Sequence, residues 1–74
     1  MTNNQINPKK LSLSKWTAVT PKNREKHFLV TKVIKAEDSE LVVACLLEAV
    51  LTGREYQMDW RDLKDNSVWL PGWR

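Results

Sequence analysis

The sequence contains a single cysteine, Cys45, within an apolar run over residues 41–47. A disulfide needs a pair of cysteines, and small secreted domains usually carry several, so this content predicts a reducing, cytoplasmic setting. One cysteine and one histidine, His27, cannot supply the four nitrogen or sulfur ligands of a structural zinc site. We therefore expect no metal and no cofactor.

Glycine is nearly as scarce, with only Gly53 and Gly72. Two glycines cannot build a phosphate-cradling P-loop or a dinucleotide-binding fingerprint. The longest uncharged apolar run has seven residues, whereas a membrane-spanning helix needs about 20. The first ten residues, MTNNQINPKK, lack the apolar segment of a signal peptide. These absences predict a soluble, unprocessed protein without membrane contact.

Tryptophan is abundant instead, at four of the 74 positions. A domain of this size buries only about 60% of the surface that its unfolded chain exposes. Residues that each bury about 150–250 Å² therefore matter for its stability. We expect mainly core roles for Trp16, Trp60, Trp69 and Trp73, with Trp60 buried and Trp73 partly exposed.

The pattern along the chain predicts one small, mainly β domain over residues 9–74, after a flexible polar arm over residues 1–8. We expect an antiparallel meander of about four strands that forms a partly closed or barrel-like sheet. A short helical turn and an irregular, tryptophan-rich C-terminal tail follow it. Residues 15–19 and 27–34 are strand-like, and the turn between them has Pro21 at its second position.

Residues 41–51 fit either a helix or a strand. The helix is supported by apolar residues at helical spacing, by N-cap candidates at Asp38 and Ser39, and by Gly53 just beyond its end. The strand is supported by the next segment, because residues 54–60 alternate in the way that pairing requires. We prefer the strand.

In the strand interpretation, residues 52–53 form a two-residue hairpin loop. Pairing back from this loop sets Leu47 opposite Met58 and Cys45 opposite Trp60, all on one apolar face. A threonine at position 52 suits so tight a turn poorly, so a slightly longer loop remains an alternative.

The register of residues 27–34 stays open. A loop of even length near residues 38–39 turns the even-numbered side chains inward, including the charged Lys32. A loop of odd length turns the odd-numbered side chains inward. The inward sets are Phe28, Val30 and Ile34 in the first case, and Leu29, Thr31 and Val33 in the second.

The net charge of +3 is unevenly distributed. Residues 1–35 contain eight basic residues and one acidic residue, and residues 36–74 contain four basic and eight acidic residues. This asymmetry predicts an acidic partner, of which RNA or DNA is the kind that we favour. The alternative is that the lysines only solubilise the domain, or pair with its acidic half. No RNP-like or helix-turn-helix motif is present.

The nucleic-acid hypothesis depends on basic residues near one turn and on a tryptophan beside them. The ring of Trp16 offers a stacking surface for a base, and each neutralised phosphate releases counterions. The candidate nucleic-acid-binding residues are Lys15, Trp16, Lys22, Arg24 and Lys26.

The alternative function is that of a protein-interaction or homodimerising module. The outer face of the expected sheet carries more apolar surface than so small a domain easily covers. A partly exposed tryptophan near the C-terminus adds an aromatic contact for a partner. The candidate partner-binding residues are Val42, Leu46, Val50 and Trp73.

The sequence contains no convincing set of catalytic residues, and we expect a protein that is not an enzyme. His27 and Cys45 are the pair most like a base and a nucleophile. They point to opposite faces in one register, and lie more than about 10 Å apart in the other. Asp59, Asp62 and Asp65 recur every three residues without the glycine of a calcium loop, which favours capping and turn roles.

Five blocks of sequence occur in order: SKWTAVTP, KHFLVTKV, LEAVLT, DWRDLKD and WLPGW. They resemble a family of short, tryptophan-rich bacterial proteins of unknown function, from about residue 7 to residue 74. The resemblance implies a complete member of that family. It implies no activity and assigns no catalytic residue.

Overall fold

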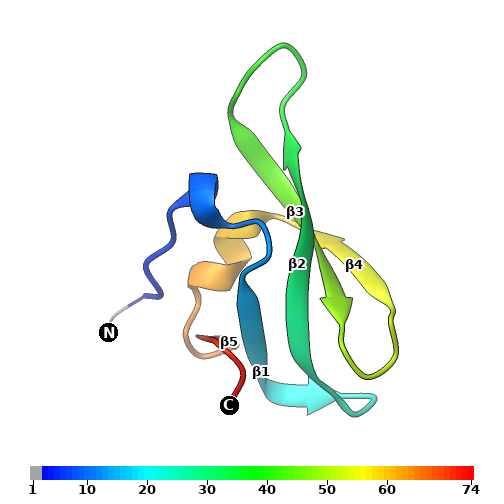
Figure 1. The fold of residues 1–74 in the computed structure, drawn as a ribbon. Helices are drawn as coiled ribbons and strands as arrows, with labels where there is room; N and C mark the ends of the chain where they lie inside the picture. The colour runs from blue at the N-terminus through cyan, green and yellow to red at the C-terminus, as the bar shows by residue number, and fades with distance from the viewer. Residues whose placement is uncertain (1–2) are drawn as a thin grey trace.

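The computed structural model describes residues 3–74, which form a five-stranded antiparallel sheet (Figure 1). Two short 3₁₀ helices lie before and after the first four strands. The prediction of a mainly β, antiparallel fold is confirmed, with five strands in place of about four. The elements are η1 (Pro8–Lys10), β1 (Lys15–Lys22), β2 (Glu25–Lys35), β3 (Val42–Ala49), β4 (Glu55–Met58), η2 (Trp60–Lys64) and β5 (Trp69–Pro71).

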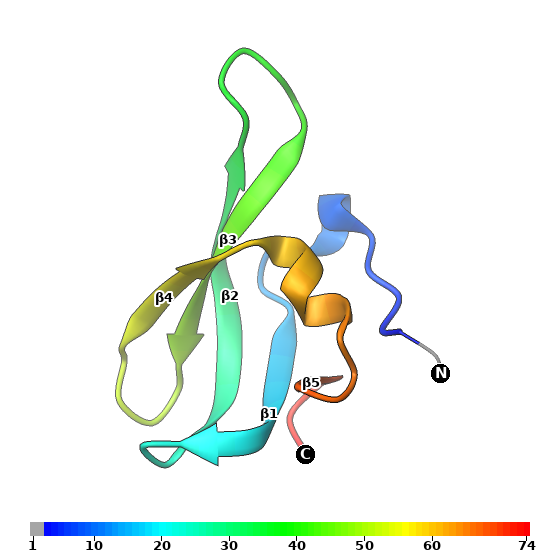
Figure 2. The same cartoon turned by 180° about the vertical axis from the view of Figure 1, so that it is seen from behind.

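The sheet has the strand order β4-β3-β2-β1-β5. The first four strands form a meander, and β5 returns to pair with β1. The sheet bends strongly, so β4 and the β1–β2 hairpin curl toward the same side without pairing (Figure 2). The sheet is therefore open and curved, and the predicted partial or barrel-like closure does not form.

One irregularity in the β2–β3 ladder decides which side chains of β2 face the core. The register holds from Phe28 to Val30 and then shifts by one residue before Lys32. Such a bulge reverses the alternation of faces. Lys32 is therefore exposed, and Val33 packs against the core. Each of the two registers left open by the sequence is correct over part of the strand.

A second shift in the β2–β3 register lies near the start of β3, where β3 has one more residue than the matching part of β2. Val42 is consequently buried, as is Cys45 three residues later. The prediction that Val42 shares an outer face with Leu46 and Val50 is wrong, because the extra residue breaks the alternation of the strand.

The β3–β4 hairpin keeps the predicted faces but has a longer loop, over residues 50–54. Cys45 pairs with Met58 instead of Trp60. Since the register differs by two residues, each side chain stays on its predicted face. The preference for a strand over a helix is confirmed, but the predicted pairing is wrong because Trp60 has left the sheet and begins η2. Asp59 caps that helix through its side chain.

The β1–β2 hairpin turns on two residues with left-handed backbone angles. Asn23 has φ 55° and Arg24 has φ 63°, and they separate the paired residues Lys22 and Glu25. Positive φ at both central residues matches the twist of a two-residue hairpin. Pro21 lies within β1, so its predicted place in the turn is wrong.

The core lies on the concave side of the sheet, under η2. Trp16 and Trp60 are only 4% and 8% exposed. Each indole N–H has an acceptor when buried, as its polarity requires: Ser14 Oγ at 2.8 Å and the Val42 carbonyl at 2.9 Å. The predicted burial of Trp60 is confirmed. The buried apolar residues are Leu11, Trp16, Phe28, Val30, Val42, Cys45, Leu47, Ala49, Trp60 and Leu63.

The segment before η1 is attached to the domain from Asn4 onward. Residues 1–2 of the predicted flexible arm lie outside the described residues. The side-chain amide of Asn4 donates to backbone carbonyls of η2 and β5, at 2.8 Å each, and its backbone N–H donates to η2 at 2.9 Å. Ile6 packs against the core. These contacts tie the segment to both ends of the η2–β5 connection.

Candidate functional site: an aromatic groove beside a basic hairpin

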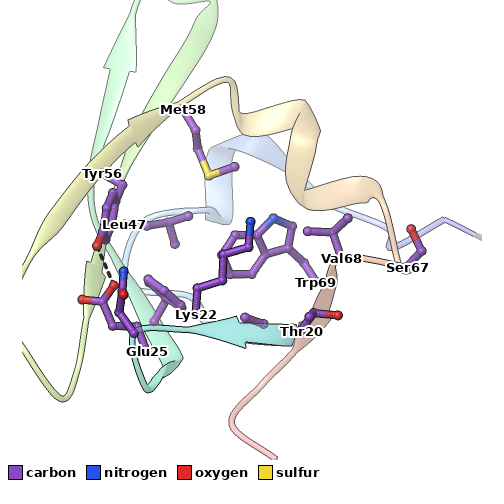
Figure 3. Close-up of a pocket in the computed structure, with 12 residues that line it drawn as sticks. Thr20, Lys22, Glu25, Leu47, Tyr56, Met58, Ser67, Val68 and Trp69 are labelled. Carbon is purple, nitrogen blue, oxygen red and sulfur yellow. Dashed lines mark hydrogen bonds between the residues drawn. The ribbon is translucent and has the colours of Figure 1, made fainter.

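An open groove lies on the concave side of the sheet, between β4 and the end of β1 (Figure 3). Its volume is about 640 Å³, which is within the range of about 300–1,000 Å³ typical of ligand sites. The walls are mainly apolar and include three aromatic rings. The principal wall residues are Phe28, Leu47, Tyr56, Met58, Val68 and Trp69.

The aromatic rings are held by contacts with one another. Phe28 projects from β2, and the ring of Trp69, at the start of β5, meets it edge-on with centroids 5.2 Å apart. Tyr56 of β4 meets Phe28 from the other side at 6.2 Å, also edge-on. Edge-to-face packing of this kind is favourable and fixes ring orientation. The groove therefore presents aromatic surfaces of defined geometry.

Lys22 is the one unpaired charge among the described residues that line the groove. It ends β1, and its side chain extends across the groove between Leu47 and Trp69 (Figure 3). It forms no ion pair within residues 3–74. An uncompensated ammonium group at an apolar surface attracts an anionic group of a ligand.

Glu25 also borders the groove, but its charge is satisfied internally. The residue is 4% exposed, and its carboxylate accepts hydrogen bonds from the hydroxyls of Thr52 and Tyr56, the latter at 2.5 Å. These bonds, that of Thr52 first, hold the pKa of Glu25 below its ordinary value of 4.5. The same carboxylate raises the pKa of Tyr56. Glu25 thus ties the start of β2 to β4 and its preceding loop.

Residues 14–74 match the sequence profile of a family described as Tryptophan-rich protein (DUF2389). The chain belongs to this family. No curated protein and no solved structure matches the chain. The resemblance inferred from the five sequence blocks is confirmed. Because the family is a domain of unknown function, the function of this DUF2389 protein has to be argued from its own residues.

The basic residues predicted to contact nucleic acid lie at both ends of β1. Lys22 lines the groove, Arg24 stands in the adjoining turn, and Lys26 follows two residues later. All three are exposed. Lys15 is also exposed, but at the start of β1 and on the outer face of the sheet. Of the four basic candidates, Lys22 lines the groove, and Arg24 and Lys26 are its exposed neighbours in the chain.

The stacking surface predicted at Trp16 needs correction. β1 turns the ring of Trp16 into the core, where it is 4% exposed, so a base cannot stack on it in the folded protein. Trp69 is half-buried in the groove wall instead. It is the tryptophan that lines the groove together with Lys22 (Figure 3).

The C-terminal tail crosses from β5 to the outer face of the sheet. Gly72, with φ +79°, permits the reversal. The hydroxyl of Thr17 donates to the Gly72 carbonyl at 2.7 Å and accepts the N–H of Arg74 at 3.0 Å. The indole of Trp73 donates to a backbone carbonyl of β2 at 2.9 Å. The predicted tail is rich in tryptophan as expected, but residues 69–71 are not irregular, because they form β5.

Trp73 is 44% exposed and lies among cationic groups. Lys15 Nζ lies 4.7 Å from the ring centroid, within the range of a cation–π contact. The ring of His27 lies 6.2 Å away, and Arg74 Nε donates to the Pro71 carbonyl at 3.0 Å. The predicted partial exposure of Trp73 is confirmed.

The residues predicted to bind a protein partner are only partly at the surface. Val42 is in the core, and Leu46 is half-buried. Val50, in the loop after β3, is 50% exposed. With Trp73 on the face of β1 and β2, the expected continuous stripe along one strand does not form.

Cys45 and His27 lie in different parts of the molecule, and their side chains do not come together. Cys45 is fully buried, and burial raises the pKa of its thiol to about 11, with the charges of Asp59 and Asp62 adding to the effect. A thiol with so high a pKa stays protonated and unreactive. His27 lies on the outer face, with Nε2 2.9 Å from the carbonyl oxygen of Arg74.

Two of the three aspartates predicted to cap turns, Asp59 and Asp65, do so through their side chains. Asp59 and Asp65 accept the backbone N–H groups of Arg61 and Ser67, at 2.9 Å each. Within residues 3–74, no three His, Cys, Asp or Glu side chains gather closely enough to hold a metal ion. In the same part of the chain, no helix has the length and apolar character to span a membrane.

Sequence reasoning missed the groove as a site. A usable signal was present, because Tyr56 and Met58 alternate on the apolar face of the last strand of the predicted meander, which has a neighbour on one side only. An apolar edge strand leaves surface that something must cover. In the structure, Trp69 and Val68 cover it from across the groove, and only in part.

Proposed function

We propose that this protein is a non-enzymatic binding module for single-stranded nucleic acid, RNA or DNA. A base enters the groove and stacks on Trp69, and the adjoining phosphates lie along Lys22, Arg24 and Lys26. The observation that carries the proposal is the opening of an aromatic groove beside a hairpin with three exposed basic residues. Stacking surfaces combined with a basic track are the usual means of binding single strands.

The distribution of ion pairs supports an external anion. Of the eight basic residues in residues 1–35, only Lys35 forms an ion pair among the described residues, with Glu40 at 2.6 Å. The alternative that the acidic half of the chain neutralises the basic half gains no support from these contacts. Unpaired surface cations attract a polyanion and release its counterions on binding.

Arg24 gives a second line of support. Its φ of 63° lies in the left-handed region, where a side chain other than glycine or asparagine costs about 1–2 kcal/mol. Glycine is the residue that this turn position favours. Backbone strain concentrates at functional sites, and an exposed arginine in the turn next to Lys22 supplies a phosphate contact in return for that strain.

A protein partner is the second candidate. β4 lies at the edge of the sheet, and its outer side pairs with no strand of the described residues. Leu51, in the loop that leads to β4, is 69% exposed, and Val50 is 50% exposed. A partner strand added to β4, from another protein or from a second copy, would cover the groove.

Tryptophan fluorescence tests the proposal directly. A mixed-sequence single strand, titrated at about 50 mM salt, is expected to quench the emission because Trp69 lines the groove. The triple variant Lys22→Gln, Arg24→Gln, Lys26→Gln should lose most of the affinity. The matched control, Lys9→Gln, Lys10→Gln, Lys35→Gln, removes the same charge elsewhere and should lose less.

Two results would contradict the proposal. One is the absence of quenching by any single strand, and the other is an equal loss of affinity in both triple variants. A stable dimer in sedimentation, with no quenching, would favour the second candidate.

A further inference from the structure

The WLPGW element places one tryptophan on each side of the sheet. Trp69 lies in the groove on the concave side, whereas Trp73 lies over Lys15 and His27 on the outer side. Because β5 is an edge strand, the element crosses the edge of the sheet between these two positions.

The crossing depends on β5 and on Gly72. β5 is the edge strand on the β1 side of the sheet, with Trp69 opposite Ala18. Gly72, at φ +79°, then turns the chain to the outer face, and an added Cβ would meet no atom within 4 Å. Glycine is thus favoured at this position because of the positive φ, and not because a side chain would lack space.

At the outer end of the crossing, cationic side chains form a second place where an anionic group could bind. Lys15 and Arg74 form no ion pair within residues 3–74. The bond from Arg74 Nε to the Pro71 carbonyl holds the guanidinium beside β5. Lys15 Nζ is held near the ring of Trp73, whose indole N–H is fixed to the backbone of β2.

We infer that Trp73, Lys15 and Arg74 form a second contact for the single strand that enters the groove, so that the strand passes over the edge at β5. This inference rests on the proposed function and names its substrate class: a single strand longer than the groove alone holds. A base stacks on the exposed part of Trp73, and the cations bind the flanking phosphates. A strand confined to the groove does not reach this contact.

The test compares two lengths of thymidine oligonucleotide, a trinucleotide and one of about nine residues, within the usual range of site sizes. Affinities are measured by fluorescence for the full chain and for Trp73→Ala and Lys15→Gln. Each variant should lower the affinity for the longer strand by about tenfold and leave that for the trinucleotide unchanged. Lys35→Gln, with the same loss of charge on the far part of β2, should change neither.

Lys15→Gln leaves the hydrogen bonds that anchor the tail in place. It therefore still tests the inference if Trp73→Ala weakens binding only by loosening the tail. Equal effects of Lys15→Gln on both lengths, or no effect on either, would overturn the inference. The proposed function then still stands if the hairpin triple variant weakens binding of the trinucleotide. Failure of both lengths to bind the unaltered protein would overturn the inference and the proposed function together.

Discussion

At the scale of single residues, Glu25 is the group through which acid should act on stability. Its pKa is lowered by the hydroxyls of Thr52 and Tyr56. A carboxyl with a lowered pKa in the folded state stabilises that state fully above its ordinary value of 4.5. This stabilisation is lost as the pH falls through the lowered pKa.

The prediction concerns Glu25→Gln. The variant should unfold more easily than the unaltered protein at neutral pH, and the difference in free energy of unfolding should shrink as the pH falls below 4.5. Urea denaturation followed by tryptophan fluorescence at a series of pH values measures it. A difference that stays constant over this range would show that the charge of Glu25 is not what its partners stabilise.

Cys45 provides a second residue-scale prediction. Because the thiol is fully buried and its pKa is raised to about 11, it should react with a thiol reagent only when the protein unfolds. Native and urea-unfolded samples at neutral pH can be compared by mass spectrometry after brief labelling. Rapid labelling of the native protein would contradict the placement of Cys45 in the core.

At the scale of elements, a change in the β1–β2 turn is expected to raise the stability of the protein and to weaken its binding of a single strand. Arg24→Gly should relieve the left-handed strain and raise the free energy of unfolding by about 1 kcal/mol. It should also weaken single-strand binding, because a phosphate contact is removed. Asp38→Gly is the control, since Asp38 also has a left-handed φ, 58°, lies between β2 and β3 and does not line the groove, and aspartate tolerates this region. It should change the stability less and leave the affinity unchanged.

Denaturation and fluorescence titration of these two variants give both quantities. If Arg24→Gly binds a single strand as tightly as the unaltered protein does, Arg24 takes no part in binding. The strained turn then loses its functional explanation.

The strands themselves were predictable where pairing and alternation agree. The β3 segment has apolar residues at helical spacing, yet the alternation of Tyr56 and Met58 after it decided correctly for a strand. The register of β2 was not predictable, because the bulge before Lys32 joins two registers. Burying an unpaired ammonium group is costly, and one extra residue turns it to solvent, but no local signal marks that position.

The groove shows more clearly which features could not be predicted from the sequence. The position of the basic residues Lys22, Arg24 and Lys26 around one turn was predicted from sequence, since charge and turn chemistry are local properties. The aromatic partner was not, because the choice between Trp16 and Trp69 depends on the bend of the sheet. It also depends on a three-residue strand, β5, which pairs with β1 across more than 50 positions of sequence. So short a strand has no periodicity to detect.

At the scale of the whole molecule, the unpaired basic residues predict a salt dependence. Each phosphate contact to a single strand contributes about −0.7 to the slope of log affinity against log salt concentration. Contacts from Lys22, Arg24 and Lys26 therefore give a slope of about −2 for a tetranucleotide, which has three phosphates between its nucleosides. Titrations at several salt concentrations measure it, and a slope near zero would mean that these cations do not meet phosphates.

The central claim is that the groove is where a single strand binds. The four indole N–H groups give separate signals in a two-dimensional ¹H–¹⁵N NMR spectrum, and each reports on one tryptophan. On addition of a short single-stranded oligonucleotide, the signal of Trp69 should shift most, while those of the buried Trp16 and Trp60 stay in place. Unchanged spectra, or shifts that leave the Trp69 signal in place, would contradict the account.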